Sequence, residues 1–284
     1  KAADTGHDHR PGQMTMKILT GGSGPSDARW KYWPTWTKML PLYFRCKHKD
    51  VSGPAAGNLF IARSLIYHLQ RFKPDVIVAQ WNFDRYDLYV GQQPFADQIR
   101  QSESNRNFMV DVPTGGKTTG GTGYWCSSKD NIVDWKKYFV ENIQSRKGTM
   151  MDDLQNMLTL QEVCTRHNIQ YRFFMHGTID HDFLRSDAEI KSLHHEIDWD
   201  CLIDTSIEES KKKYAGHQEF NDIEETGKTT QVPNPLVQFD ILQNTVAPAL
   251  EQLGATPRED RSRLKAYCEQ KQNALTEAYK NAQQ

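Results

Sequence analysis

Residues 16–23 read MKILTGGS, a short apolar run that ends in two glycines and a serine. Residues 75–81, DVIVAQW, form a second compact apolar run. Short continuous apolar runs bounded by Gly, Pro or polar residues are typical of parallel strands buried on both faces. We therefore expect two buried strands of one sheet, with Ser23 at the carboxyl end of the first.

Helical patterns alternate with these strands along the chain. Apolar residues recur at helical spacing in four segments, which are 33–42, 57–72, 149–167 and 236–253. Segments 169–175 and 198–204 are predicted as further strands. Alternation of this kind is typical of a parallel sheet covered by helices on both faces. The sequence thus predicts a three-layer α/β domain over residues 16–254.

Three segments fall outside this pattern. Residues 1–15 are predicted as a polar N-terminal extension, and residues 255–284 as a C-terminal helical tail. Residues 91–131 are rich in Gly, Thr, Ser, Asn and Gln, and we expect a long loop insertion there. Its GGK at 115–117 is similar to a phosphate-binding loop, but Asp111 stands where that loop requires its first glycine. No nucleotide site is expected.

Composition excludes several classes of partner. The chain has 284 residues, 35 basic and 36 acidic, and a net charge of −1, so no overall field attracts nucleic acid or an anionic membrane. No apolar run is long enough to span a bilayer. The five cysteines are widely spaced and form no CxxC pair, as expected of reduced thiols in a protein made in a cytosol. No cofactor is predicted.

Polar and small residues follow each of the first three expected strand positions. Ser23 comes after Gly21 and Gly22, residues 50–58 (DVSGPAAGN) form a turn that opens a helix, and Asn82 follows the strand at 75–81. Ligands of open α/β sheets bind beyond the carboxyl ends of the strands. We expect these three segments to converge at that edge.

With these blocks the chain resembles the SGNH (GDSL-type) hydrolase family, and it is most similar to the divergent SGNH-like proteins of marine bacteriophages. The resemblance covers about residues 16–253 and implies a three-layer flavodoxin-like sheet. It assigns Ser23 as the nucleophile. The oxyanion hole would be formed by Asn82 and a backbone N–H at Ala55 or, with a shifted register, at Gly53 or Gly57.

The family's last block departs from its pattern in this chain. The family places an aspartate three residues before a histidine-proline pair there, and residues 229–250 read TTQVPNPLVQFDILQNTVAPAL. Thr229 stands at the aspartate position, Val232 at the histidine position, and Gln238 where a second histidine is common. Valine accepts no proton, and a serine without a base is a poor nucleophile. The resemblance therefore indicates a degenerate site.

Two histidines offer a relocated base. His176 and His181 follow the strand predicted at 169–175, and Asp180 and Asp182 flank His181 in the sequence. An Asp–His pair of this kind could serve Ser23 if the fold brought it near. Ordinary polar loop residues are the alternative.

The adjacent residues His194 and His195 do not form a metal motif. Neighbouring helical residues point in different directions, and no second ligand pair has suitable spacing. We expect both to lie at a solvated helix end, and no metal site is predicted.

Two functions remain open on the sequence. The first is a structural or binding component of a phage particle, associated with the virion, whose partners are other protein chains or a glycan. The alternative is an active serine esterase or carbohydrate deacetylase that uses Ser23 with His176 or His181. A carbohydrate-binding module is a third and weaker candidate.

Overall fold

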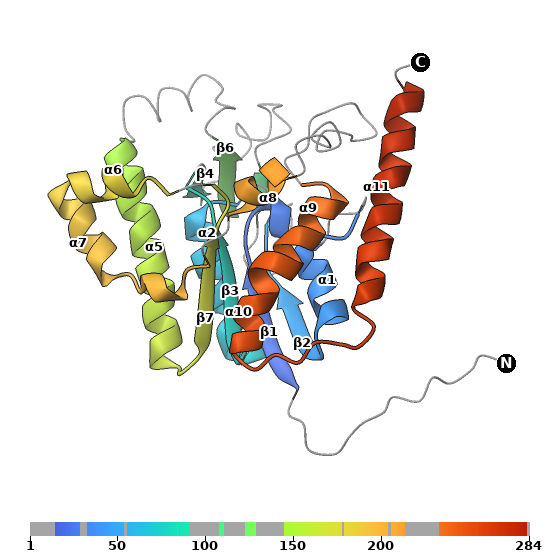
Figure 1. The fold of residues 1–284 in the computed structure, drawn as a ribbon. Coiled ribbons are helices and arrows are strands. Elements are labelled where there is room, and N and C mark those ends of the chain that lie inside the picture. Colours follow the sequence, from blue (N-terminus) through green and yellow to red (C-terminus); the bar gives the residue numbers. More distant parts are fainter. Residues whose placement is uncertain are drawn as a thin grey trace.

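The computed structural model describes residues 15–28, 33–53, 56–83, 85–90, 108–110, 123–128, 145–177, 179–203, 206–213 and 233–282. Its centre is a parallel sheet of four strands (Figure 1), which are β1 (Met16–Gly21), β2 (Cys46–Asp50), β3 (Val76–Trp81) and β7 (Gln170–Met175). The strands lie in the order β2-β1-β3-β7. The two strands predicted from the apolar runs are therefore the inner strands, and the α/β class is confirmed.

Side chains of the inner strands alternate between two apolar clusters. Leu19 and Ile77 belong to one cluster, whereas Ile18 and Val78 belong to the other. Successive residues of a strand point to opposite faces of the sheet, so the two clusters lie on its two faces. Both faces are consequently buried, which explains why the inner strands are continuously apolar.

Helices cover both clusters. The cluster that contains Leu19 is covered by α2 (Asn58–Phe72), α5 (Arg146–Arg166), α6 (His181–Ser186) and α7 (Ala188–Glu196). The cluster that contains Ile18 is covered by α1 (Trp36–Tyr43), α8 (Ile207–Lys213), α9 (Pro235–Asp240), a π-helical segment (Ile241–Val246), α10 (Ala247–Gln252) and α11 (Ser262–Ala282). Helices α2 and α5 also lie against each other.

Strand β2 was expected only by its place before the turn at 50–58, and its polar sequence CKHKD gave no bounds for it. It pairs with β1 in parallel register, Met16 opposite Cys46 and Thr20 opposite Asp50, and forms one edge of the four-stranded sheet. Charged residues on an edge strand discourage pairing with other chains. An edge strand of this composition has no apolar periodicity from which it could be recognised.

The strand predicted at 198–204 is wrong for most of its length. Residues Trp199–Cys201 form a 3₁₀ turn, and the side chain of Asp198 accepts a hydrogen bond from the N–H of Asp200 at 3.1 Å. This local cap favours the turn over an extended strand. Among the described residues of this segment, 198–203, Leu202 alone forms a parallel bridge, to Phe173 of β7.

The segment predicted as a loop at 91–131 contains strands. An antiparallel three-stranded sheet is formed by β4 (Arg85–Val90), β6 (Gly123–Ser128) and β5 (Phe108–Val110), in that order. Aromatic and β-branched residues in FMV (108–110) and GYWCSS (123–128) favour strands. The Gly-rich stretch 112–122 lies outside the described residues.

The helix predicted at 236–253 is present but interrupted by the π-helical segment. Pro248 lacks an N–H, and its ring would clash with the carbonyl four residues earlier in an α-helix. In the wider π turn the N–H of Ala247 donates to the carbonyl of Leu242 instead. The proline thus accounts for the interruption.

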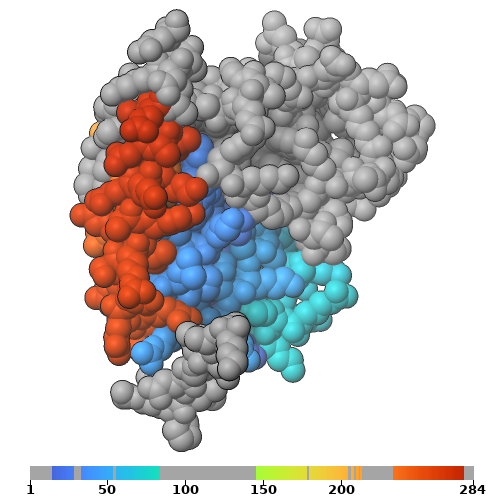
Figure 2. Space-filling model, turned by 90° about the vertical axis from the view of Figure 1, so that its right-hand side faces the viewer, coloured from blue at the N-terminus to red at the C-terminus, as the bar shows by residue number. Residues whose placement is uncertain are grey.

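The predicted C-terminal helix is α11, and it packs on the domain. Figure 2 shows α11 (red) lying against the N-terminal half of the chain (blue). Leu264 and Cys268 join the apolar cluster that contains Ile18. The helix therefore contributes to the core. None of the helices in the described part of the chain is long and apolar enough to cross a membrane.

Candidate functional site

Ser23 and Asn82 lie where the sequence predicts them, beyond the carboxyl ends of neighbouring strands. Ser23 follows β1 and Asn82 follows β3, and these strands pair with Gly21 opposite Ala79. Both side chains are buried, with Ser23 0% and Asn82 1% exposed. The edge expected to carry a site is therefore formed, but its serine is covered.

The side-chain amide of Gln80 occupies the space next to Ser23. Its Oε1 accepts hydrogen bonds from the N–H of Ser23 at 3.1 Å, the Oγ of Ser23 at 3.2 Å and the Oγ of Ser26 at 2.9 Å. The indole N–H of Trp36 donates to the Oγ of Ser26 at 2.8 Å. Because all four residues are fully buried, they form a closed polar network in which each group supports the next.

Gly22 allows this network to form. A Cβ at this position would lie 2.7 Å from the Oγ of Ser26 and 2.8 Å from Oε1 of Gln80. Neither atom can retreat without breaking the bonds just described. The glycine is thus required by the close approach of the Gln80 amide, and the GGS turn is explained without any catalytic role.

Two of the residues predicted to form the oxyanion hole, Gly57 and Asn82, lie near the start of α2. Gly57 is the N-cap residue of α2, and Asn58, the first residue of that helix, accepts a hydrogen bond from the N–H of Asn82 at 2.8 Å. The amide nitrogen of Asn58 is buried and has no hydrogen-bond partner among the described residues. The start of α2 is therefore joined to Asn82 through Asn58, the residue after Gly57, whereas Ala55 lies outside the described residues.

Neither candidate base is bonded to Ser23, whose hydroxyl donates to Gln80. His176 follows β7, which is separated from β1 by β3, and its backbone N–H donates to the carbonyl of Trp81 at 2.8 Å. His181 begins α6, where its ring packs against Trp199 with a centroid separation of 5.6 Å.

The carboxylate predicted to orient His181 serves another purpose. Asp180 caps α6 by accepting the N–H of Phe183 at 3.0 Å, and it forms an ion pair with Arg146 at 2.9 Å. Both contacts lower the pKa of Asp180, and the hydrogen bond from the N–H of Phe183 has the larger effect. Asp182 is exposed in the first turn of the same helix. Asp180 therefore serves first as a helix cap and as the partner of Arg146, and its interaction with His181 is a weaker Coulombic one.

The segment at the family's last block lies against the turn after β1. The indole N–H of Trp33 donates to the carbonyl of Pro233 at 2.7 Å. Gln238 donates to the carbonyl of Pro25 at 3.0 Å and accepts the N–H of Trp36 at 2.8 Å. Gln238 is thus a buried structural bridge. Thr229 and Val232 lie outside the described residues.

A second polar cluster, which the sequence did not suggest, joins the ends of β1 and β2. The Oδ1 of Asp50 accepts hydrogen bonds from Thr20 at 2.8 Å and from the hydroxyl of Ser52 at 2.7 Å, and its Oδ2 accepts the N–H of Ala28 at 2.9 Å. Nε2 of His48 lies 2.9 Å from the Oγ1 of Thr20. His48 and Asp50 are two residues apart, so they lie on one side of β2. This spacing is the only feature of the sequence that could have indicated the cluster.

Burial shifts both titratable groups of this second cluster toward their neutral forms. It lowers the pKa of His48 to about 4 and raises the pKa of Asp50 to about 6. The hydrogen bonds from Ala28, Ser52 and Thr20 hold the pKa of Asp50 below the value that burial alone would give. The cluster fixes the turn after β1 to the edge strand.

No group of three or more His, Cys, Asp or Glu side chains in the described ranges is placed to hold a metal ion. Comparison with known proteins gave no match to a family model, a curated protein or a solved structure. The site is therefore interpreted from its own geometry.

Proposed function

We propose that this chain is an SGNH-hydrolase-like protein without esterase activity, and that it serves as a structural or binding component of a phage particle. The observation that carries the proposal is the bond from the buried Oγ of Ser23 to Oε1 of Gln80. The particle role rests on the sequence resemblance.

The strand order supports the SGNH-like fold. The sheet runs β2-β1-β3-β7, and Leu202 adds a parallel bridge to β7. When the four strands are numbered by their order along the chain, the sheet order is 2-1-3-4, as in a flavodoxin-like sheet. Leu202 lies where such a sheet has its fifth strand, beyond β7. Ser23, Gly57 and Asn82 also lie at the edge where the resemblance requires them.

Two features argue against the esterase alternative. A nucleophilic serine needs a base that removes its proton, and an amide oxygen such as that of Gln80 does not act as one at neutral pH. It must also be reached by substrate, whereas Ser23 has no exposed surface. Hydrolysis through Ser23 with His176 or His181 would require this network to open.

Ester hydrolysis separates the two functions. Wild type and Ser23→Ala should hydrolyse p-nitrophenyl acetate at the same rate, no faster than heat-unfolded protein at equal concentration. A wild-type rate that exceeds both controls would support the esterase instead.

Association with particles tests the structural role. Particles of a phage whose genome encodes this chain would be purified on a gradient and analysed by quantitative mass spectrometry. The chain should be present at a fixed ratio to the capsid subunit. Recovery only in the particle-free lysate would contradict the particle role. It would not bear on the absence of esterase activity, which the hydrolysis assay tests separately.

A further inference from the structure

Helices α6 and α7 form a lobe, residues 179–197, on the outside of α5 (Figure 1). Leu184, Ile190 and Ile197 anchor this lobe in the cluster that contains Leu19. The sequence predicted His194 at a solvated helix end, and that prediction is wrong. His194 is only 7% exposed, whereas its neighbour His195 is exposed.

His194 lies among aromatic rings. Its ring is tilted by 33° against Trp199, with a centroid separation of 4.7 Å, and it meets the ring of His181 edge-on at 5.8 Å. Both ring nitrogens of His194 are buried, and neither has a hydrogen-bond partner among the described residues. The ring packs as a neutral aromatic group, because protonation would bury a charged N–H that finds no acceptor in the described part of the chain.

The groups that face His194 are cationic or neutral. Arg185 and His181 of α6 and His195 of α7 act on its charge, and all three disfavour protonation. Burial is the largest cause that lowers the pKa of His194 below its ordinary value of 6.5, and these three groups lower it further. Protonation in place would add a positive charge where positive charges already gather.

The nearby carboxylates are engaged elsewhere or exposed. Asp198 accepts the hydroxyl of Tyr171 at 3.1 Å, and Glu196 is exposed. From α5, Gln161, which is uncharged, donates to the carbonyl of Glu196 at 3.0 Å. Among the described residues, no carboxylate acts on the charge of the His194 ring.

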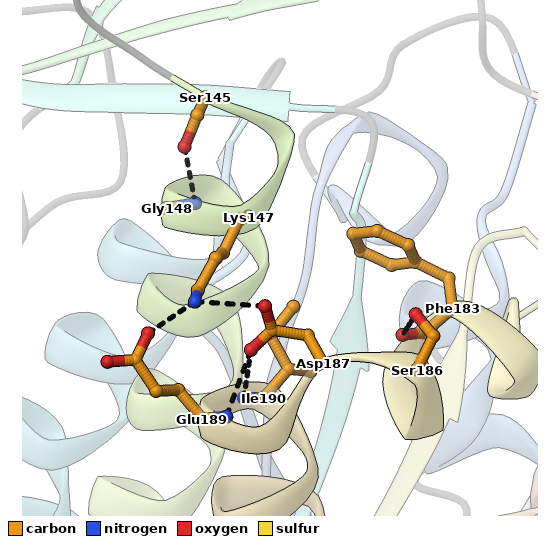
Figure 3. Close-up of polar contacts among 8 residues, drawn as sticks. All are labelled: Ser145, Lys147, Gly148, Phe183, Ser186, Asp187, Glu189 and Ile190. Carbon is orange, nitrogen blue, oxygen red and sulfur yellow. Dashed lines mark hydrogen bonds and ion pairs between the residues drawn. The ribbon is translucent and has the colours of Figure 1, made fainter.

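The other end of α7 is held by charges. Figure 3 shows Lys147 of α5 between Asp187 and Glu189; it lies 2.9 Å from Asp187 and also contacts Glu189. Asp187 additionally caps α7 by accepting the N–H of Ile190 at 3.2 Å. Mild acid leaves this attachment in place, because these contacts lower the pKa of Asp187 below its ordinary value.

We propose that His194 makes the lobe acid-sensitive: its protonation releases the C-terminal end of α7 from Trp199 and α5, while Lys147 retains the N-terminal end. The sign follows from linkage, because the open state binds a proton below pH 6.5 that the closed state excludes. Acidification below that pH therefore favours opening, which exposes the apolar side chain of Ile197 at the C-terminal end of α7. This inference does not depend on the loss of esterase activity.

Hydrogen exchange of the full chain, read by mass spectrometry on peptides covering residues 188–199, tests the proposal. Protection corrected for the intrinsic exchange rate should fall about fivefold between pH 6.5 and 5.5, as uptake of one proton by an open state with the ordinary pKa of 6.5 requires. His194→Phe, which keeps an aromatic ring, should remove this dependence. His195→Phe keeps the His194 ring and removes only the weakest of the charges that act on it, so the dependence should persist. Constant wild-type protection, or a pH dependence that persists in His194→Phe, would overturn the proposal.

If His194→Phe does not fold, NMR titration of the histidine rings of the wild type tests the same proposal. In the wild type the His194 ring should titrate below 6.5, together with the loss of protection in α7. A ring that takes up its proton at the ordinary pKa while α7 stays protected would equally overturn it.

Discussion

Ser23 and Gln80 are joined twice: the backbone N–H and the hydroxyl of Ser23 both donate to Oε1 of Gln80, at 3.1 and 3.2 Å. The serine that the sequence resemblance marks as a nucleophile is thus a structural donor. The network around it fixes the turn after β1 and ties that turn to β3.

Replacement of Gln80 tests the network. Gln80→Leu would leave the N–H and O–H of Ser23 buried without an acceptor, and each such group costs about 1–3 kcal/mol. We expect a loss of about 3 kcal/mol in the free energy of unfolding, measured by urea denaturation. Gln155→Leu, at an exposed position of α5, should change it by less than about 0.5 kcal/mol. Equal effects of the two substitutions would contradict the network's role.

Gly22→Ala tests the close approach of the Gln80 amide. The added Cβ would lie 2.7 Å from the Oγ of Ser26, so a loss of about 2–3 kcal/mol in stability is expected. Gly148→Ala is the matched control, since its Cβ would meet only the Oγ of Ser145, at 3.2 Å, and alanine favours the helix. Thermal melts of both variants provide the measurement. If Gly22→Ala were as stable as Gly148→Ala, the turn after β1 would accommodate a Cβ at residue 22, contrary to this account.

His48 and Asp50 should give stability opposite pH dependences. His48, with its pKa lowered to about 4, loses stabilisation as the pH falls from 6.5 toward 4, because the unfolded chain is protonated first. Asp50, with its pKa raised to about 6, gains stabilisation as the pH falls from 6 toward 3.8, because the folded chain is protonated first. The two contributions oppose each other in the wild type.

Single substitutions should reveal each dependence. As the pH falls from 6.5 to 4.5, the free energy of unfolding of His48→Gln should rise relative to that of the wild type. Over the same pH range, the free energy of unfolding of Asp50→Asn should fall relative to that of the wild type. Urea titrations at three pH values measure both slopes. Slopes of the same sign in the two variants would show that burial is not what sets these pKa values.

Helix α11 should contribute to stability through its buried side. Leu264→Ala removes a side chain that is 8% exposed, so a loss of about 2–3 kcal/mol is expected. Leu42→Ala makes the same change at a position 54% exposed on α1 and should cost less than about 1 kcal/mol. Denaturant midpoints compare the two. If Leu264→Ala proved as mild as Leu42→Ala, α11 would be a separable tail.

The strands and helices with strong apolar patterns could be predicted from the sequence. The runs at 16–20, 75–81 and 169–175 predicted strands of the parallel sheet, because strands buried on both faces must be apolar throughout. The bounds of β2 could not be predicted, since an edge strand tolerates the polar sequence CKHKD. Residues 198–204 were misjudged because the cap from Asp198 is a local preference that competes with strand formation.

The candidate site could be placed from the sequence but not interpreted in full. Strand order alone brings Ser23 and Asn82 to one edge. The burial of Ser23 depends on the side chain of Gln80, and nothing in the sequence distinguishes a glutamine that points into this turn from one that does not. His194 was misplaced because a histidine beside charged residues is usually exposed.

Labelling with a serine-reactive fluorophosphonate, read by mass spectrometry at the peptide that contains Ser23, tests the central claim most directly. Folded protein should remain unmodified under conditions that fully label an active serine esterase, because the Oγ of Ser23 is buried and bonded to Gln80. Stoichiometric modification of Ser23 in folded protein, abolished by prior unfolding, would contradict this account and identify an activated serine.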